Sequence, residues 1–125
     1  MYVLDSSAII ELLNNGPLAS KVARLAPEED FVTTTISMHE VLVGAISEKE
    51  SFIVENLFSG ATMLEHTADA ARAGALIQKQ LSASGTKINK MDVLIAGICR
   101  ANRAEIITLD GDFMNIKGLR VHLIQ

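Results

Sequence analysis

The chain has 125 residues, of which 49% are hydrophobic and 21% are charged, and its formal net charge at pH 7 is −4. We therefore expect one domain over residues 1–125, and the charge has the wrong sign for nucleic-acid binding through overall electrostatics alone. Cys99 is the only cysteine, which excludes an internal disulfide, and the lack of a long apolar run or leader-like segment predicts a cytoplasmic protein without a membrane span.

Short β-type segments alternate with helical patterns along the chain. The predicted strands and helices, in chain order, cover residues 1–4, 7–14, 18–26, 31–34, 38–46, 49–58, 61–64, 68–84, 90–102, 105–109 and 120–124. Strands that are separated by helices pair in parallel, with helices on both faces of the sheet. The pattern therefore predicts an α/β fold, an α/β/α sandwich with a central parallel sheet of about five strands.

Several acidic residues come directly after predicted strands or in the first turns of predicted helices. The carboxyl ends of parallel strands and the N-termini of the following helices meet at one edge of the sheet, so we expect these acids to face that edge together. Asp69 is left out, because it is expected to lie too far along the sheet. The expected set is Asp5 after the first strand, Glu40 in the first turn of the helix after the second strand, Asp92 near the start of helix 90–102, and Asp110 and Asp112 after strand 105–109.

Each of these acids also has a purely structural interpretation. Asp5 is a candidate N-cap, and Ser37 with Glu40 fits a capping box. Asp92 suits the helix dipole, and Asp110 suits a turn. The structural interpretations are less convincing for the whole set of acids. The segment "KMDVLIAGIC", which contains Asp92, is apolar on nearly every face and predicts a buried helix. A carboxylate at the start of a buried helix needs a partner, and a divalent cation is the candidate that all the acids can share.

The order of the motifs resembles that of a known family. A first strand ends in Asp-Ser-Ser, and "SMHEVLVGA", "NKMDVLIAGICRAN" and "IITLDGDF" follow it. These motifs, over essentially the whole chain, resemble the PIN-domain ribonucleases, and in particular the VapC-type toxins of toxin–antitoxin pairs. The resemblance implies a PIN-like fold and a metal-dependent endoribonuclease. It also implies that the catalytic and metal-binding acids are Asp5, Glu40, Asp92 and one or both of Asp110 and Asp112.

The chemistry of the acids predicts a metal cofactor, the resemblance implies two hydroxyl neighbours, and contact with RNA requires positive charge beside the site. Carboxylate oxygens suit Mg²⁺ or Mn²⁺. Ser7 and Thr108 would be hydroxyl neighbours that orient a carboxylate or a metal-bound water, or else an ordinary cap and strand-end residue. Lys87 and Lys90 flank the approach to Asp92 and are the candidate RNA-phosphate contacts, or else part of a solvated turn.

The expected partners are an RNA substrate, a VapB-like antitoxin and a second copy of the chain in a homodimer. The segments "VENLF" and "LVGAI" carry more apolar residues than one buried helix face needs, which indicates either a contact surface or plain core packing. The histidines His39, His66 and His122 are scattered along the chain, so structural roles are expected for them.

Two other functions are considered. A non-catalytic PIN-like scaffold that binds protein or RNA would have lost the acids, whereas this chain carries the full set. An acidic-pocket phosphatase would need a second aspartate two residues after the first, and Asp5 is followed by Ser6 and Ser7 instead.

Overall fold

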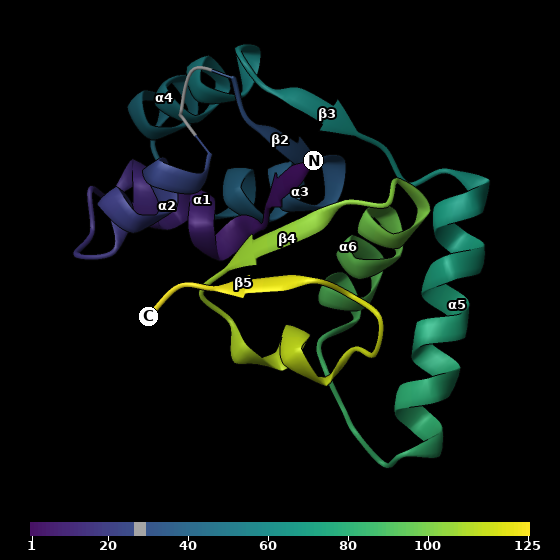
Figure 1. Cartoon of the computed structure of the whole chain (residues 1–125). Coiled ribbons are helices and arrows are strands. Elements are labelled where there is room, and N and C mark those ends of the chain that lie inside the picture. Colours follow the sequence, from purple (N-terminus) through teal and green to yellow (C-terminus); the bar gives the residue numbers. More distant parts are fainter. Residues whose placement is uncertain (27–29) are drawn as a thin grey trace.

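The computed structural model describes residues 1–26 and 30–125. Within these residues, five strands form one all-parallel sheet in the order β3-β2-β1-β4-β5 (Figure 1). The strands are β1 (Tyr2–Leu4), β2 (Val32–Thr34), β3 (Thr62–Leu64), β4 (Glu105–Thr108) and β5 (Val121–Leu123).

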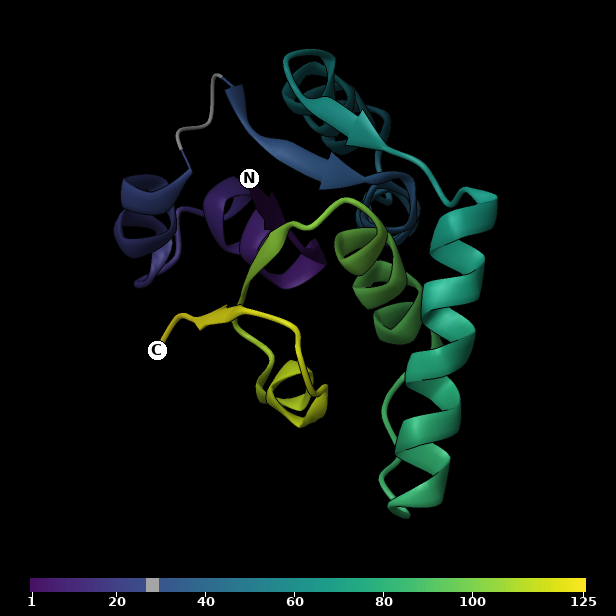
Figure 2. The same ribbon diagram turned by 45° about the vertical axis from the view of Figure 1, so that its right-hand side comes forward.

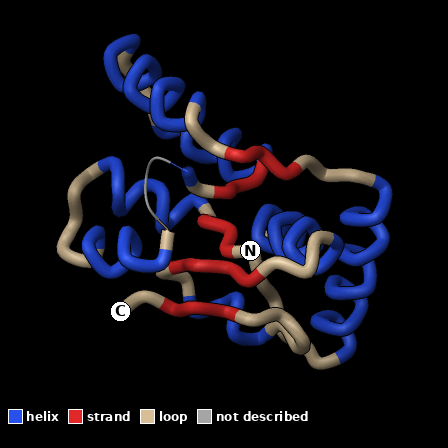
Figure 3. Tube along the Cα trace, turned by 45° about the horizontal axis from the view of Figure 1, so that its top comes forward, coloured by secondary structure: helices blue, strands red, loops and turns tan. Residues whose placement is uncertain are grey.

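Helices flank this sheet on both sides, as Figure 3 shows with the strands in red and the helices in blue. The predicted α/β/α sandwich with a five-stranded parallel sheet is confirmed. None of the helices in the described residues combines the length and apolar composition that crossing a membrane requires. The helices are α1 (Ser6–Leu13), α2 (Ala19–Leu25), α3 (Thr35–Gly44), α4 (Glu48–Ser59), α5 (Ala68–Ala83), α6 (Lys90–Ala101) and the short 3-10 helix η2 (Gly111–Asn115).

Each face of the sheet carries its own hydrophobic core. Successive strand residues point to opposite faces. Leu4 and Ile107, which are paired in register, pack with residues of α1 to α4. Their neighbours Val3 and Ile106 pack on the other face with residues of α5 and α6. All four side chains are fully buried, and burial of each contributes about 1.5–3 kcal/mol to folding.

Helix α6 lies between the sheet and α5, and Figure 2 shows α5 running along its outer side. The two helices approach closely at two glycines. A Cβ atom on Gly97 would lie 2.7 Å from the carbonyl oxygen of Ala70 and 2.9 Å from the Cα of Gly74. This contact holds α6 in one position, and with it Asp92 in the first turn of α6.

The chain reverses its direction of travel across the sheet at β1. It runs from β1 to β2 and β3 on one side, and then returns to β4 and β5 on the other side. In open α/β sheets, ligands bind in the crevice outside the carboxyl ends of the strands at such a switch point. Asp5 directly follows β1, and Asp110 lies two residues after the end of β4.

One helix begins earlier than predicted. Helix α3 starts at Thr35, directly after β2, because the Thr34 side chain accepts a hydrogen bond from the Ser37 amide at 3.0 Å and caps the helix. The prediction that the helix starts at residue 38 is therefore wrong, and so is the Ser37–Glu40 capping box. Glu40 lies in the second turn of α3 and not in the first. Helix η2 was not predicted.

Candidate active site

Asp5 is the most buried acid of the predicted set, with 3% of its surface exposed. Its Oδ1 accepts hydrogen bonds from the Ala8 amide at 3.0 Å and from Ser7 Oγ at 2.7 Å. Its Oδ2 accepts one from Thr108 Oγ1 at 2.5 Å. Asp5 is thus the N-cap of α1, as the structural interpretation proposed. Because a carboxylate offers about four lone-pair positions, one position on Oδ2 remains for another ligand.

The hydroxyls of Ser7 and Thr108 connect Asp5 to the chain segment after β4. Ser7 Oγ accepts a hydrogen bond from the Leu109 amide, and Thr108 Oγ1 accepts one from the Asp110 amide, both at 2.9 Å. Each hydroxyl therefore donates to the Asp5 carboxylate while accepting from the backbone. This network fixes the orientation of the Asp5 side chain relative to the residues that follow β4.

Glu40 reaches the same region from α3. Its carboxylate is half-buried, and its Oε1 accepts a hydrogen bond from Ser6 Oγ at 2.5 Å. Ser6 is not among the site residues that the sequence predicts. The available signal was the Asp-Ser-Ser motif itself, in which both serines follow the capping aspartate.

Asp92 lies half-buried in the first turn of α6. Burial raises the pKa of its carboxyl from the ordinary value of 3.8 to about 7, and the negative charges of Asp110, Glu40 and Asp5 act in the same direction, as does a hydrogen bond with Asp110. Burial also raises the pKa of Asp5, against the three hydrogen bonds that it accepts. Asp5, Glu40, Asp92 and Asp110 therefore form one electrostatically coupled group, which we call the acidic cluster.

Two further acids, Asp112 and Asp69, lie outside the acidic cluster. Asp112 is exposed, and its backbone amide donates a hydrogen bond to Asp110 Oδ1 at 2.9 Å, so that Asp110 caps η2. Asp112 does not contribute to the raised pKa of Asp92 or of Asp5. Asp69 forms an exposed ion pair with Arg72 at 3.0 Å. Of the five predicted acids, the structure therefore brings four together and leaves Asp112 at the edge.

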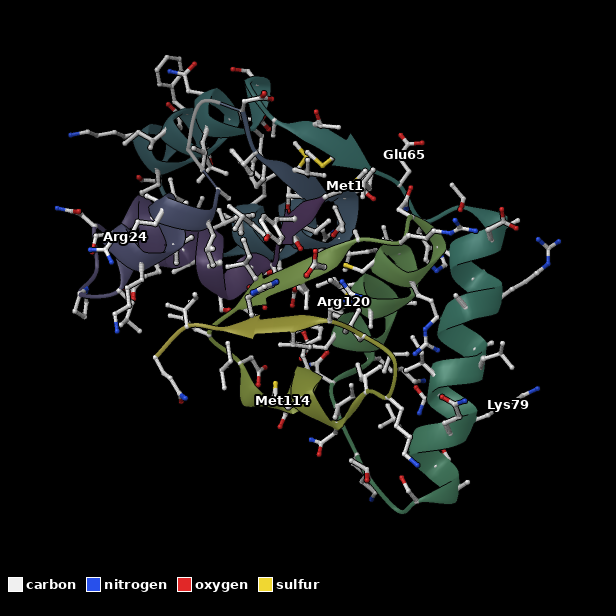
Figure 4. All side chains as sticks on the ribbon, viewed as in Figure 1. Met1, Arg24, Glu65, Lys79, Met114 and Arg120 are labelled. Atoms are coloured by element: carbon white, nitrogen blue, oxygen red, sulfur yellow. The ribbon has the colours of Figure 1, made fainter. Side chains whose placement is uncertain are left out.

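No lysine or arginine in the described part of the chain forms an ion pair with the acidic cluster. Lys87 and Lys90 are both exposed; Lys87 lies in the segment before α6, and Lys90 is the first residue of α6. Figure 4 shows Arg24 and Lys79 extending outward from opposite sides of the molecule. The acidic cluster thus carries its charge without a cationic side chain to balance it.

The donors of the acidic cluster suit a hard divalent cation, because all of them are carboxylate oxygens. Within residues 1–26 and 30–125, no group of three acidic, histidine or cysteine side chains forms a metal site by itself. Mg²⁺ usually takes only one or two carboxylates and completes its shell with water and phosphate oxygens. The residues present fit that kind of site, with Asp5 offering a single remaining position.

The histidines lie outside the acidic cluster, and the cysteine is buried. His39 and His66 are exposed, and His122 Nε2 lies 3.0 Å from Glu105 Oε1 in a pair on the sheet. Burial raises the pKa of the Cys99 thiol to about 12, so this thiol is not a nucleophile at neutral pH.

An apolar surface lies over α3 and α4. In "VENLF", Val54 and Phe58 are buried, so these two residues belong to the core. In "LVGAI", Val43 and Ile46 are 71% and 91% exposed, so these two side chains lie on the surface. Beside them lies a groove of about 290 Å³ between α1, α3 and α4, whose apolar lining includes Ile10, Leu13, Val41 and Ile53.

The chain resembles known proteins over nearly its whole length. A family model described as PIN domain matches residues 2–119. Among solved structures, VapBC-1 from nontypeable Haemophilus influenzae shares 26% identity, with 98% of this chain and 96% of that chain covered and a TM-score of 0.83. VapBC2 from Rickettsia felis, in a structure bound to a DNA fragment from their promoter, shares 19% identity, with 99% and 98% covered and a TM-score of 0.86.

A third structure carries a description of activity. VapC20 from Mycobacterium tuberculosis, described as a sarcin–ricin loop cleaving toxin, shares 14% identity, with 100% of both chains covered and a TM-score of 0.71. No curated protein matches the chain.

Proposed function

Because this chain belongs to the PIN-domain family, as its motifs predicted, we propose that it is a metal-dependent endoribonuclease and the toxin of a toxin–antitoxin pair. The observation that carries this proposal is the convergence of Asp5, Glu40, Asp92 and Asp110 at the switch point of the sheet. RNA as the substrate is supported by the description of VapC20 as a toxin that cleaves the sarcin–ricin loop.

The residues of the acidic cluster have separate roles in this proposal. Bound Mg²⁺ or Mn²⁺ would supply charge neutralisation for the phosphate and a water of lowered pKa. Asp5, with its remaining position on Oδ2, and Asp92 would be the principal ligands. Glu40 and Asp110 would complete the site directly or by orienting water. Asp92 must lose its proton to coordinate, so metal affinity rises as the pH increases through about 7.

Ser7 and Thr108 contribute by holding the Asp5 carboxylate. Their hydrogen bonds, with that of the Ala8 amide, occupy three of the lone-pair positions on Asp5 and direct the remaining one. Lys87 and Lys90 are exposed next to the first turn of α6, and we assign them to contacts with RNA phosphates. Aromatic residues make up only 4% of the chain, which disfavours extensive base stacking.

The partners follow from the same family membership. The Haemophilus and Rickettsia structures are named as VapBC pairs, which supports an antitoxin as a partner of this chain. We assign the antitoxin to the apolar groove between α1, α3 and α4, next to the exposed Val43 and Ile46. A homodimer remains an expectation from the family resemblance.

The test is cleavage of RNA by the purified chain with Mn²⁺, with and without a chelator. We expect Mn²⁺-dependent cleavage that Asp5→Asn reduces by at least about 100-fold, since each lost contribution to charge stabilisation costs a factor of about 10²–10³. Asp69→Asn is the matched control, because it removes an exposed carboxylate outside the acidic cluster and should leave cleavage unchanged.

Three outcomes would contradict the proposal. Full Mn²⁺-dependent cleavage by the folded Asp5→Asn variant would show that the acidic cluster is not the active site. Hydrolysis of an aryl phosphate without cleavage of RNA would favour a phosphatase, and inactivity toward both substrates would favour a non-catalytic scaffold.

A further inference from the structure

The hydrogen bond between Ser6 and Glu40 joins two helices at the acidic cluster. Ser6 Oγ, at the first position of α1, donates to Glu40 Oε1 on α3 at 2.5 Å, although the residues are 34 positions apart in the chain. Neither the predicted elements nor the family motifs gave Ser6 a role.

Asp5 and Glu40 are held by different numbers of hydrogen-bond donors. Three donors hold Asp5, whereas Ser6 is the only described donor to the Glu40 side chain. A glutamate side chain has one more rotatable bond than an aspartate, and holding it in one conformation costs more rotamer entropy. Glu40 therefore depends on this one hydrogen bond for its orientation, and a hydrogen bond to a charged carboxylate is among the stronger kinds.

The position of Ser6 is itself fixed by the capping of α1. Asp5, the preceding residue, is held by the Ala8 amide and the Thr108 hydroxyl, so the first turn of α1 is a rigid support. A serine hydroxyl has one proton to donate, and it is directed to Oε1 of Glu40. Oε2 of Glu40 has no described hydrogen-bond donor and stays available as an acceptor.

We propose that Ser6 is a positioning residue that holds the Glu40 carboxylate at a fixed separation from Asp5, so that the two acids act on the same divalent cation. This inference rests on the proposed function, and it concerns only how one of the acids is oriented. Ser6 does not touch the metal or the RNA in this role. It acts through Glu40.

A purely structural role for the Ser6–Glu40 hydrogen bond would give different experimental results. If the hydrogen bond only fastened α1 to α3, its loss would lower the thermal stability of the metal-free protein and leave the affinity for metal unchanged. A positioning role requires the affinity to change, and requires that change to depend on Glu40.

The experiment is a double-mutant cycle with Mn²⁺ binding measured by calorimetry and thermal unfolding measured without metal. We expect Ser6→Ala to weaken Mn²⁺ binding about tenfold, the lower end of the range for residues that orient metal ligands. Ser6→Thr keeps the hydroxyl and should retain most of the affinity. In a Glu40→Ala background, Ser6→Ala should have no further effect on the affinity. Ser59→Ala is the matched control, because Ser59 donates only to the Asn56 carbonyl at 2.7 Å on the surface.

Each outcome decides the question. Wild-type affinity in a folded Ser6→Ala variant, or an equal loss in the Glu40→Ala background, would overturn the positioning role while leaving the proposed function intact. Failure of the wild-type chain both to bind Mn²⁺ and to cleave RNA would overturn the proposed function, and this inference with it. RNA cleavage gives a second measurement, in which Ser6→Ala should lower kcat and leave KM nearly unchanged.

Discussion

Replacing Asp92 with asparagine should make the metal-free protein more stable at neutral and alkaline pH. The folded state holds the proton of Asp92 up to a pKa of about 7, whereas the unfolded chain releases it near 3.8. The contribution of this bound proton to the unfolding free energy is therefore fully present below about pH 4, and it is lost as the pH rises through 7. Asparagine has the shape of the protonated acid and does not titrate, so the variant avoids that loss.

The size of the effect follows from the two pKa values. A rise from 3.8 to about 7 corresponds to about 4 kcal/mol in favour of the protonated form, at about 1.36 kcal/mol per pH unit. Asp92 is half-buried, and solvent screening reduces the expected gain in unfolding free energy to about 1–2 kcal/mol. For a chain of this length that gain corresponds to a rise in Tm of roughly 3–10 °C.

The assay is thermal unfolding of the wild type, Asp92→Asn and Asp69→Asn at pH 4, 6 and 8 with a chelator present. The gain for Asp92→Asn should be largest at pH 8 and absent at pH 4, and the exposed Asp69→Asn should show no such trend. Addition of Mn²⁺ at 100 times its Kd should stabilise the wild type by about 2.7 kcal/mol and the Asp92 variant much less. If Asp92→Asn were no more stable than the wild type at pH 8, the ionised Asp92 carboxylate would not destabilise the folded state, and the explanation of its raised pKa by burial and charge repulsion would be wrong.

The remaining predictions concern the edge of the acidic cluster and the helix that supports it. Asp110→Asn should reduce Mn²⁺-dependent RNA cleavage by at least about tenfold, because this carboxylate acts on Asp92. The exposed Asp112→Asn should reduce cleavage by less than about twofold. Equal losses of cleavage in the two variants would contradict the assignment of Asp110, and not Asp112, to the acidic cluster. Gly97→Ala should lower the unfolding free energy by about 1–3 kcal/mol in denaturant titration, because its Cβ would overlap α5. Gly44→Ala, where nothing lies within 4 Å of the added Cβ, is its control, and a similar loss there would refute close packing as the cause.

Much of the architecture was predictable from the sequence for a local reason. Alternating strands and helices leave parallel pairing as the natural arrangement, and parallel pairing places every strand end and helix start at one edge. Asp5 and Asp92 could be assigned to that edge without knowing any contact, because each lies within two residues of an element boundary.

The start of α3 shows where local rules fail. Thr34 and Ser37 are both suitable caps by residue type. In the structure Thr34 is the cap: its hydroxyl accepts a hydrogen bond from the Ser37 amide and donates one to the Ser37 hydroxyl, so Ser37 lies inside the first turn of the helix. That shift moves Glu40 from the first turn of the helix to the second, and so changes the direction in which its side chain leaves the helix.

The order of the elements, the edge at which the acids gather and most of the acids concerned therefore follow from local sequence patterns. Contacts between distant segments select one of two neighbouring residues. Asp110 and not Asp112 acts on Asp92, and Ser6 donates to Glu40 while Ser7 donates to Asp5. Successive residues on a helix point about 100° apart, so their targets depend on which element packs opposite each one. Such packing arises between segments far apart in the chain, here 34 residues for Ser6 with Glu40 and 103 for Asp5 with Thr108.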